Sequence, residues 1–465
     1  MKNNSLKRTI IFAVAIHIGL LSIIACENFV EIDVPDSQMT AKNVFEDKAT
    51  AQAALANIYI KMQNSVLVTG NFNGISNLLG NYADELNYYG VDGQREEAFY
   101  KNVLLPSNST ISETWNNTYN LIYASNAIIE GVNESTGIPQ KDKMGLIGEA
   151  LFLRAYLHFY LTNLFGSIPY ATTTDYRLNT TIAKKSTAEV YRLLIEDLEN
   201  AKSALSDQYP TNERVRPNKG VAEALLARVN LYSENWDAAQ AEANVIINNT
   251  ALYGWEEDID KVFLKDSRGT LWQLMPQFAG NNTFEAQSFI FFTGPPPVSG
   301  LGTSLIESFE SGDLRKEHWV GTVTNGLENW YFANKYKENN NTGTSREYSI
   351  LFRLEEIYLI RAEARAHLGN ISEAQRDLNK IRHRAGLSDT PADTQSELLV
   401  AILKERQVEL FTELGHRWFD LKRFGVANEV LGAHKTAWNS TDILWPLPQS
   451  ELLLNENLLP QNPGY

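Results

Sequence analysis

The chain has 465 residues but a single cysteine, Cys26, so it cannot form an internal disulfide. It also lacks the short motifs that mark several enzyme classes, because HExxH, GxSxG, a P-loop and GxGxxG are all absent. Its seven histidines are scattered without the spacing of metal ligands. A pair of carboxylates facing across a cleft, as glycosidases need, leaves no such motif and stays open as an alternative. We therefore predict that the protein is not an enzyme and has no catalytic residue, cofactor or metal.

Long apolar runs are also scarce, and after Cys26 no stretch is apolar for long enough to cross a bilayer. Before it, basic residues at positions 2, 7 and 8 precede an apolar run over residues 9–25, which ends in IIAC. This order is typical of a lipoprotein signal, so we predict that residues 1–25 are a cleaved signal peptide and that Cys26 is lipidated. An ordinary signal peptide or an anchor helix is the alternative. Acyl chains on Cys26 would hold the protein on a membrane.

Basic residues are also fewer than acidic ones. The chain has 41 Lys and Arg against 56 Asp and Glu, which gives a formal net charge of −15. Such an acidic balance argues against nucleic acid or an anionic ligand as a partner. Hydrophobic residues make up 43% of the chain, which is enough to bury a large core. We expect a soluble body that is tethered by its lipid and does not bind nucleic acid.

What the sequence does contain is a set of helix pairs. Residues 359–381 align without a gap on residues 224–246, with small residues where the helices would cross, as in tetratricopeptide-type pairs. Looser copies pair residues 57–62 with 115–129, and 146–164 with 190–205. The predicted fold is therefore mainly α, a scaffold of tetratricopeptide-like helix pairs with little β structure. Large irregular, loop-rich insertions are expected at about 66–109 and 248–345.

Several residues near the second copy are predicted to be structural. Arg406 lies on the apolar side of its helix, so we expect it to form a buried ion pair. His416 is interpreted as a satisfied core residue rather than a metal ligand, and Trp418 as part of the core. Asn370 and Glu373 have the spacing of a helix N-cap and its third residue.

Two C-terminal segments carry a resemblance to a known family. ERQVELFTELGHRWFDLKRFG (405–425) and LPQSELLLNENLLPQNPGY (447–465) resemble the C-terminal signature of the SusD-like (RagB/SusD) outer-membrane nutrient-binding lipoproteins, and residues 27–62 and 149–170 are similar to other family segments. The resemblance implies that residues 26–465 form a single SusD-like domain on the outer membrane, exposed at the cell surface. It further implies binding of a glycan, which is delivered to a SusC-like TonB-dependent transporter.

The two insertions are the expected place for ligand-binding residues. A pyranose has a flat face of C–H groups that an aromatic ring can cover, and a rim of hydroxyls that amides and carboxylates can bind. The whole chain is 11% aromatic, and residues 253–336 have a higher share of aromatics than that. Some of these aromatics belong to TLWQLMPQF and SFIFF, which are expected to be buried strands or extended segments. The resemblance places the family's ligand loop at residues 84–89. The predicted ligand-binding residues are Asp84, Asn87, Tyr88, Tyr89, Gln277, Asn281, Asn282, Trp330 and Tyr331.

The signature does not specify the ligand, and two alternatives stay open. The same architecture could bind peptides or another nutrient, in which case a deep pocket lined with backbone hydrogen-bonding groups is expected. A helical-repeat scaffold that contacts only proteins would instead have a filled or flat loop surface.

Overall fold

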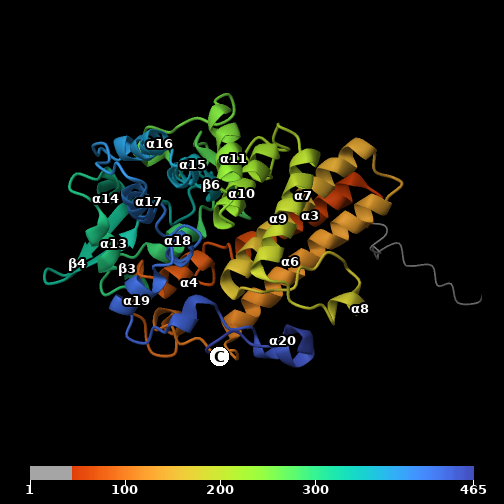
Figure 1. Cartoon of the computed structure of the whole chain (residues 1–465), viewed down its shortest axis with the longest axis horizontal. Helices are drawn as coiled ribbons and strands as arrows, with labels where there is room; N and C mark the ends of the chain where they lie inside the picture. The colour runs from red at the N-terminus through yellow and green to blue at the C-terminus, as the bar shows by residue number, and fades with distance from the viewer. Residues whose placement is uncertain (1–43) are drawn as a thin grey trace, which may run out of the picture. The chain divides into compact units, whose positions relative to one another are not determined.

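The computed structural model describes residues 44–465, so the predicted signal peptide and Cys26 lie outside the described residues. Residues 45–465 form one compact unit. It is mainly α, with short strands, which confirms the predicted fold class (Figure 1). None of the helices in the described part is long and apolar enough to cross a membrane.

Helix pairs form the scaffold, and each pair predicted from the sequence is present. The pairs are α3 (Lys48–Asn64) with α6 (Ser109–Glu134), α7 (Gln140–Phe165) with α9 (Thr187–Ala204), α10 (Lys219–Tyr232) with α11 (Trp236–Asn248), and α15 (Leu354–His367) with α16 (Ile371–Arg384). Neighbouring pairs also pack on each other, through α6 on α7, α9 on α10 and α11 on α15. The pairs therefore form one continuous array (Figure 1).

The predicted N-cap of α16 is corrected by the structure. Asn370 does occupy the N-cap position of α16, but its side chain accepts no capping hydrogen bond. Its ψ of 63° is not the extended value that brings a cap side chain onto the first turn. A full capping box instead begins the next helix, α17 (Gln395–Glu409), where Thr394 and Glu397 bind each other's backbone N–H groups.

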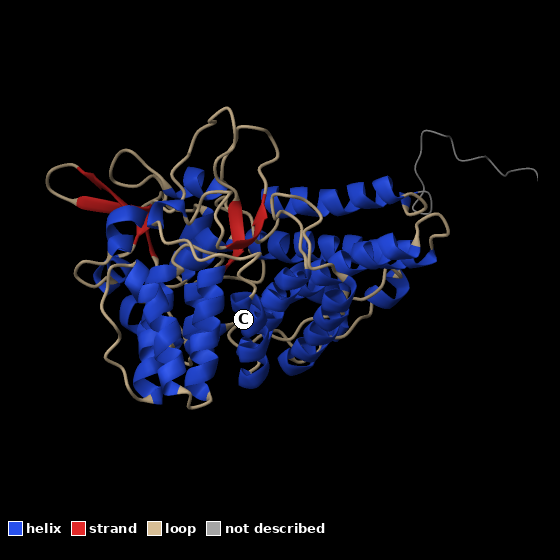
Figure 2. Cartoon of the chain, turned by 90° about the horizontal axis from the view of Figure 1, so that it is seen from above, coloured by secondary structure: helices blue, strands red, loops and turns tan. Residues whose placement is uncertain are grey.

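The insertions contain short elements and three antiparallel strand pairs among the described residues: β1 with β3, β2 with β6, and β4 with β5. The insertion elements are α4 (Ile75–Tyr82), β1 (Leu86–Tyr88), α5 (Arg95–Tyr100), η1 (Ile259–Lys261), β2 (Thr270–Leu274), α12 (Phe284–Phe289), β3 (Ser299–Leu301), α13 (Thr303–Ser308), α14 (Leu314–Trp319), β4 (Val320–Thr324) and β5 (Asn329–Ala333). In TLWQLMPQF the first five residues form the buried strand β2 as predicted, but Met275 and Phe278 are exposed, which corrects the rest of that prediction. SFIFF is also corrected, because its first two residues end α12 and Phe292 is exposed. Figure 2 shows the strands and the longest loops along one side of this unit, with most helices on the other.

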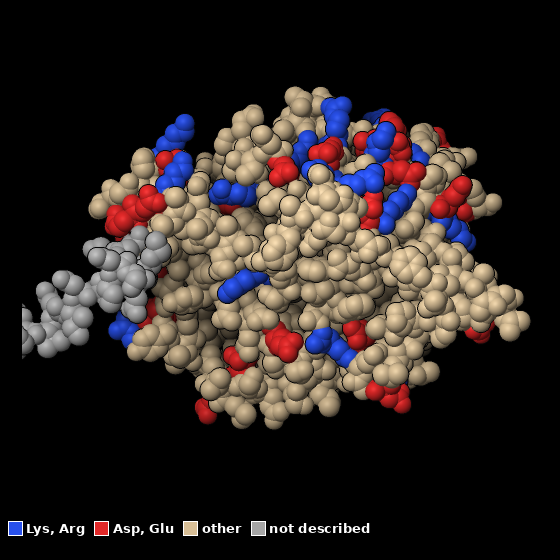
Figure 3. All heavy atoms as spheres, turned by 180° about the vertical axis from the view of Figure 1, so that it is seen from behind, with Lys and Arg blue, Asp and Glu red and all other residues tan. Residues whose placement is uncertain are grey.

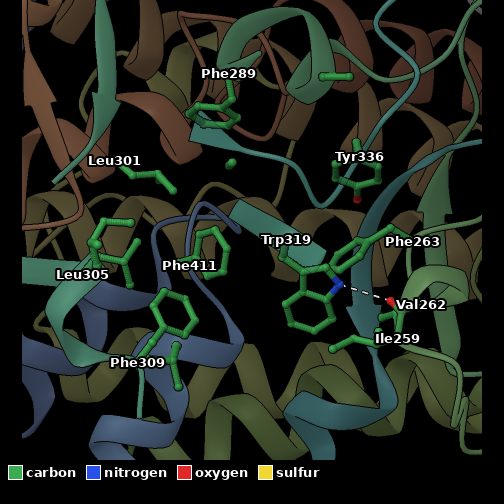
Figure 4. Close-up of a cluster of buried hydrophobic side chains, with 14 of the residues drawn as sticks. Ile259, Val262, Phe263, Phe289, Leu301, Leu305, Phe309, Trp319, Tyr336 and Phe411 are labelled. Carbon is green, nitrogen blue, oxygen red and sulfur yellow. Dashed lines mark hydrogen bonds between the residues drawn. The ribbon is translucent and has the colours of Figure 1, made fainter. Parts of the chain in front are cut away.

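The remaining elements connect or follow the pairs. They are α8 (Tyr176–Asn179), β6 (Ser349–Arg353), α18 (His416–Arg423), α19 (Ala427–His434), η2 (Ser440–Ile443), α20 (Gln449–Leu454) and η3 (Glu456–Leu458). The second insertion has its own apolar core, in which Trp319 is fully buried and donates its indole N–H to the Ile259 carbonyl at 3.1 Å (Figure 4). The Phe309 ring meets Phe411, just after α17, edge to face at 5.9 Å. The insertion is therefore fixed to the helical scaffold, and its loops have defined positions.

Candidate functional site

The predicted ligand residues of the first insertion lie at the end of β1, where this strand pairs with β3. Tyr89 is 39% exposed. The Asn87 amide is partly exposed and forms no hydrogen bond within the described part of the chain. The Tyr88 hydroxyl is already used, because it contacts the Val91 carbonyl and lies 3.1 Å from Gln94 Oε1. Asn87 and Tyr89 are thus open to a ligand, and Tyr88 supports the loop.

Asp84 has a structural role, and we correct its prediction as a ligand contact. Its carboxylate is buried and accepts two hydrogen bonds of 2.7 Å from Arg417 Nε and Nη2, and one of 3.0 Å from Ser304. Burial alone would raise the pKa of Asp84, but the bonds from Arg417 outweigh it and the pKa lies below its ordinary value. A bidentate ion pair of this kind fixes the ligand loop to α18.

Trp330 is also corrected, because its ring is 5% exposed. It packs so closely on Gly294 that a Cβ there would lie 1.9 Å from the indole. Neither ring face is therefore free to stack on a sugar. Tyr331 is partly exposed and stays a candidate, since its carbonyl lies beside Gly300, the partner of Asn87 in the β1–β3 pair.

The predicted residues of the 276–282 loop gather elsewhere, in a groove along α3. Two adjoining hollows of about 330 and 220 Å³ share Gln63, Pro276 and Gln277, and we call them together the α3 groove. Gln277 accepts a hydrogen bond of 3.3 Å from Asn64, and the Asn281 side chain accepts one of 2.9 Å from Asn341. The α3 groove is lined by Gln52, Ala56, Tyr59, Ile60, Gln63, Asn64, Thr211, Val215, Arg216, Leu274, Met275, Pro276, Gln277, Phe278, Asn281, Asn282, Phe284 and Gln287.

Asn282 also touches this groove, but it acts as a loop clamp. Its amide donates to the Asn340 carbonyl at 2.9 Å and to Thr342 at 3.0 Å, and its oxygen accepts from the N–H groups of Arg346 and Glu347. With the side chain buried and every polar atom bound, it has nothing left to offer a ligand. We therefore correct the prediction that Asn282 binds ligand.

Polar atoms that are buried without a partner mark the α3 groove. Gln63 Oε1 and Thr211 Oγ1 are both buried with no hydrogen-bond partner among the described residues. Leaving such an atom unpaired costs about 1–3 kcal/mol, so a ligand hydroxyl that reaches it regains this energy. Other lining residues of the α3 groove are apolar, namely Ala56, Ile60 and Met275.

Sequence analysis did not predict three exposed phenylalanine side chains in the two insertions. Phe278 is 64% exposed at the groove, Phe292 is 74% exposed beyond α12, and Phe72 in the first insertion is 36% exposed. Each is followed within a few residues by glycine, in FNG, FAG and FTG. Aromatics beside a glycine turn in a polar loop are the signal that could have identified them.

The C-terminal signature residues form a buried ion network rather than a binding surface. Glu409 is fully buried and lies 2.6 Å from Arg353, 2.6 Å from Arg384 and 3.0 Å from Arg315. Burial alone would raise the pKa of Glu409, but the attraction of Arg384, Arg353 and Arg315 outweighs it and the pKa lies below its ordinary value. Such a network holds β6, α14, α16 and α17 together.

Other residues of the signature segment were also predicted to be structural. Arg406 forms the expected buried ion pair, with Asp420 at 2.7 Å. Trp418 is buried as predicted. His416 is buried too, but it is not fully satisfied, because its Nδ1 has no partner in the described part. Across residues 44–465 no group of His, Cys, Asp and Glu is arranged to hold a metal ion.

Family models match two long segments of the chain. A model of the SusD family matches residues 315–443, and a model described as starch-binding, associating with outer membrane, matches residues 29–231. Among curated proteins, SusD-like protein P2 of Formosa agariphila is 28% identical over 515 aligned positions, which cover 96% of this chain and 98% of that protein. The starch-binding protein SusD of Bacteroides thetaiotaomicron is 36% identical over 124 positions, or 25% of this chain and 21% of that protein.

Solved structures share the fold over most of the chain. A SusD superfamily protein from Bacteroides vulgatus has a TM-score of 0.80 at 21% identity, covering 90% of this chain and 100% of that one. A laminarin-binding SusD-like protein has a TM-score of 0.76 at 24% identity, again covering 90% of this chain and 100% of that one. At these identities the likeness concerns the fold alone.

Proposed function

The chain belongs to the SusD-like (RagB/SusD) family, and from that premise we propose that it is a glycan-binding, not a catalytic, protein of the outer membrane. It captures an oligosaccharide or polysaccharide at the cell surface and passes it to a SusC-like TonB-dependent transporter. The names of its relatives support this ligand class, since one is starch-binding and a structural neighbour is laminarin-binding.

The observation that carries the proposal is the composition of the α3 groove. An exposed ring at Phe278 stands beside the amides of Gln277 and Asn281, and unpaired oxygens of Gln63 and Thr211 lie in the same groove. The ring covers the apolar face of a sugar, and the amides and hydroxyl bind its rim. We place the ligand in this groove.

A second contact area is formed by Asn87, Tyr89 and Tyr331 near the β1–β3 pair. Phe292, which is 74% exposed, belongs to the same insertion as Tyr331. These side chains would bind further sugars of a longer chain. Because both areas are open, net affinity after desolvation is modest, and we expect dissociation constants from micromolar to millimolar, or roughly −8 to −4 kcal/mol.

Calorimetry of the full-length protein in detergent against a panel of neutral glycans and peptides tests the proposal. At least one glycan should bind, and Phe278→Ala should weaken it about tenfold or more without lowering the melting temperature. Val400→Ala is the matched control, since Val400 is 68% exposed on α17 and lines neither contact area. Binding of a peptide, with no glycan bound, would show that the ligand is a peptide and not a glycan.

The lipid anchor is proposed from the N-terminal pattern, with Cys26 as the lipidated residue. Replacing it by alanine should move the protein from the membrane fraction to the soluble fraction. Membrane association that survives Cys26→Ala would rule out lipidation as the anchor.

The transporter is proposed to contact the pairs α10–α11 and α15–α16, which line neither hollow of the α3 groove. Arrays of such pairs present extended surfaces for protein partners. Gentle detergent extraction from the native membrane should recover a large barrel protein with this chain. Recovery of the chain alone under those conditions would count against the partnership.

A further inference from the structure

A groove of about 660 Å³ runs along α6, and it shares no lining residue with the α3 groove. We call it the α6 groove. One wall is α6 itself, and the other comes from the segment after α7 and from the C-terminal α20 and η3. None of the residues predicted from the sequence as ligand contacts lies in it. Its volume is within the range of about 300–1,000 Å³ typical of small-molecule sites.

The α6 wall is a ladder of aromatic rings. Trp115, Tyr119 and Tyr123 recur every fourth residue, so they lie on one stripe of the helix. Trp115 lies 4.8 Å from Tyr119, between ring centroids, and packs edge to face on Phe165 at 5.0 Å. The Tyr119 hydroxyl donates to the Pro169 carbonyl at 2.7 Å. The ladder is thus fixed from behind, while Tyr123 is 51% exposed at its end.

Polar groups without partners surround this ladder. The Glu451 carboxylate forms no ion pair or hydrogen bond among the described residues, and burial raises its pKa. Asn179 donates to the Thr173 carbonyl at 2.8 Å, but its side-chain oxygen is buried and unpaired in the described part. Asn116 and Asn120 are exposed beside the rings. The groove therefore offers amide donors, amide acceptors and one carboxylate.

The opposite wall is held in place by side-chain bonds to backbone. Asn455 donates to the Ile182 carbonyl at 2.9 Å and Asn457 to the Thr181 carbonyl at 2.8 Å. Lys184 donates to the Pro460 carbonyl at 2.5 Å, behind this wall. The groove is thus preformed, and little conformational entropy is lost when a ligand enters.

We propose that the α6 groove is a second carbohydrate site, which binds a neutral oligosaccharide by stacking on Tyr123 and by hydrogen bonds to Asn120, Asn179 and Glu451. None of the described lining residues is a lysine or arginine, so an anionic sugar or phosphate finds no counter-charge. A cation would meet only one carboxylate, whereas hydroxyls match amides that both donate and accept. Figure 3 shows that charge on one face of the unit gathers along its upper edge and is sparse below. The ligand class rests on the proposed function, but the location does not.

The two grooves are lined by neighbouring helices, since Asn117 of α6 donates to the Ser65 carbonyl at the end of α3, at 3.2 Å. A long glycan that reached both would gain from the high effective concentration of the second contact. The α6 groove would then retain the chain while its other end binds the α3 groove.

The test uses full-length protein in detergent with short malto- and laminari-oligosaccharides, followed by calorimetry and by hydrogen exchange. Ligand should slow exchange in peptides covering residues 115–126 and 449–458. Tyr123→Ala and Glu451→Ala should each weaken this site by about tenfold and remove that protection. Tyr176→Ala is the matched control, because Tyr176 is 74% exposed yet lines neither groove. Melting temperatures of all variants should stay unchanged, since Tyr123 and Tyr176 are exposed.

The outcomes separate this site from the main proposal. Glycan binding that protects only residues 270–287, and is lost in Phe278→Ala but kept in Tyr123→Ala, overturns the α6 site and leaves the proposed function standing. Protection of residues 115–126 by a basic peptide, but by no sugar, overturns the ligand class. A protein that binds no neutral glycan at all overturns both.

Discussion

The interior around α15 to α18 and the surfaces of the α3 and α6 grooves contain different kinds of side chains. The interior is charged, with Glu409 fully buried among Arg315, Arg353 and Arg384. Each groove has one charged lining residue, Arg216 in the α3 groove and Glu451 in the α6 groove, and otherwise combines aromatic rings and apolar side chains with amides. The family signature belongs to the first region and the ligand chemistry to the second. A signature can therefore identify the fold of this chain and say nothing about the identity of a ligand.

The physical reason lies in the constraints on each region. A buried ion pair is costly to break, because removing one partner leaves the other charge unpaired in the interior. Glu405 and Glu409, which both contact Arg315, must therefore keep this partner to maintain the fold. A groove side chain such as Phe278 has few neighbours to satisfy and can change with the ligand.

The largest expected effect comes from breaking the buried network. Glu409→Ala removes the buried carboxylate that contacts Arg315, Arg353 and Arg384, and we expect a loss of about 3–5 kcal/mol in the free energy of unfolding. Denaturant unfolding followed by circular dichroism measures it. Glu373→Ala is the control, because its pair with Arg376 is exposed on α16 and its loss should leave the midpoint unchanged. Equal midpoints for the two variants would contradict a structural role for the network.

Tryptophans give the next largest effect and test the corrected role of Trp330. Trp418 is 1% exposed and meets Tyr82 edge to face at 4.9 Å, so Trp418→Ala should cost about 3–5 kcal/mol in stability. Trp330→Ala should also lower the melting temperature, but by less, because Trp330 packs within a two-stranded hairpin. Thermal melts of both variants check this order. A Trp330 variant with unchanged melting and lost glycan binding would restore the original prediction.

A pH effect of intermediate size is expected from Glu85, where burial raises the pKa to about 8, with Asp84 adding to the shift and Arg417 and Lys335 opposing it. Between about pH 4 and pH 8 the unfolded chain gives up this proton while the folded chain keeps it. Stability attributable to Glu85 therefore falls as pH rises, by at most about 1.4 kcal/mol per pH unit.

Glu85→Gln should remove this slope, so the variant should gain stability over the natural chain as pH rises from 5 to 8. Thermal melts at four or five pH values measure the difference. In the acid range the reverse holds for Glu409, Glu413 and Asp420, whose lowered pKa values mean that stability is lost as pH falls below about 4. A difference between variant and natural chain that does not change with pH would show that Glu85 is ionised in both states.

The sequence predicted the helix pairs well because each carries a periodic apolar stripe and small residues at its crossing. Arg406 and Trp418 were also predicted correctly, because a side chain that lies among apolar positions of a helix is buried together with them. Ligand residues were harder, because Asp84, Asn282 and Trp330 have the right chemistry but are held inside by Arg417, by loop backbone and by Gly294. No local pattern reveals partners so distant in sequence. The α6 groove depends on α20 folding back near α6, which periodicity does not encode.

The smallest expected effect on stability comes from replacing Phe292, which we compare with its buried neighbour Phe291. Phe291 is 6% exposed and packs on Phe332 at 5.3 Å between ring centroids, whereas Phe292 is 74% exposed. Phe291→Ala should cost about 3–5 kcal/mol, because it opens a cavity. Phe292→Ala should change stability by less than about 0.5 kcal/mol, since it removes no packed contact.

The same pair separates stability from binding. If Phe292 is a sugar contact, its alanine variant should weaken binding of a long glycan by about threefold to tenfold while its melting curve stays that of the natural chain. Phe291→Ala, measured at a temperature where it is folded, should bind the glycan with affinity closer to that of the natural chain. Calorimetry on both variants gives the result. Unchanged binding by Phe292→Ala would remove Phe292 from the second contact area and leave Asn87, Tyr89 and Tyr331 as its members, because exposure alone does not make an aromatic ring a binding residue.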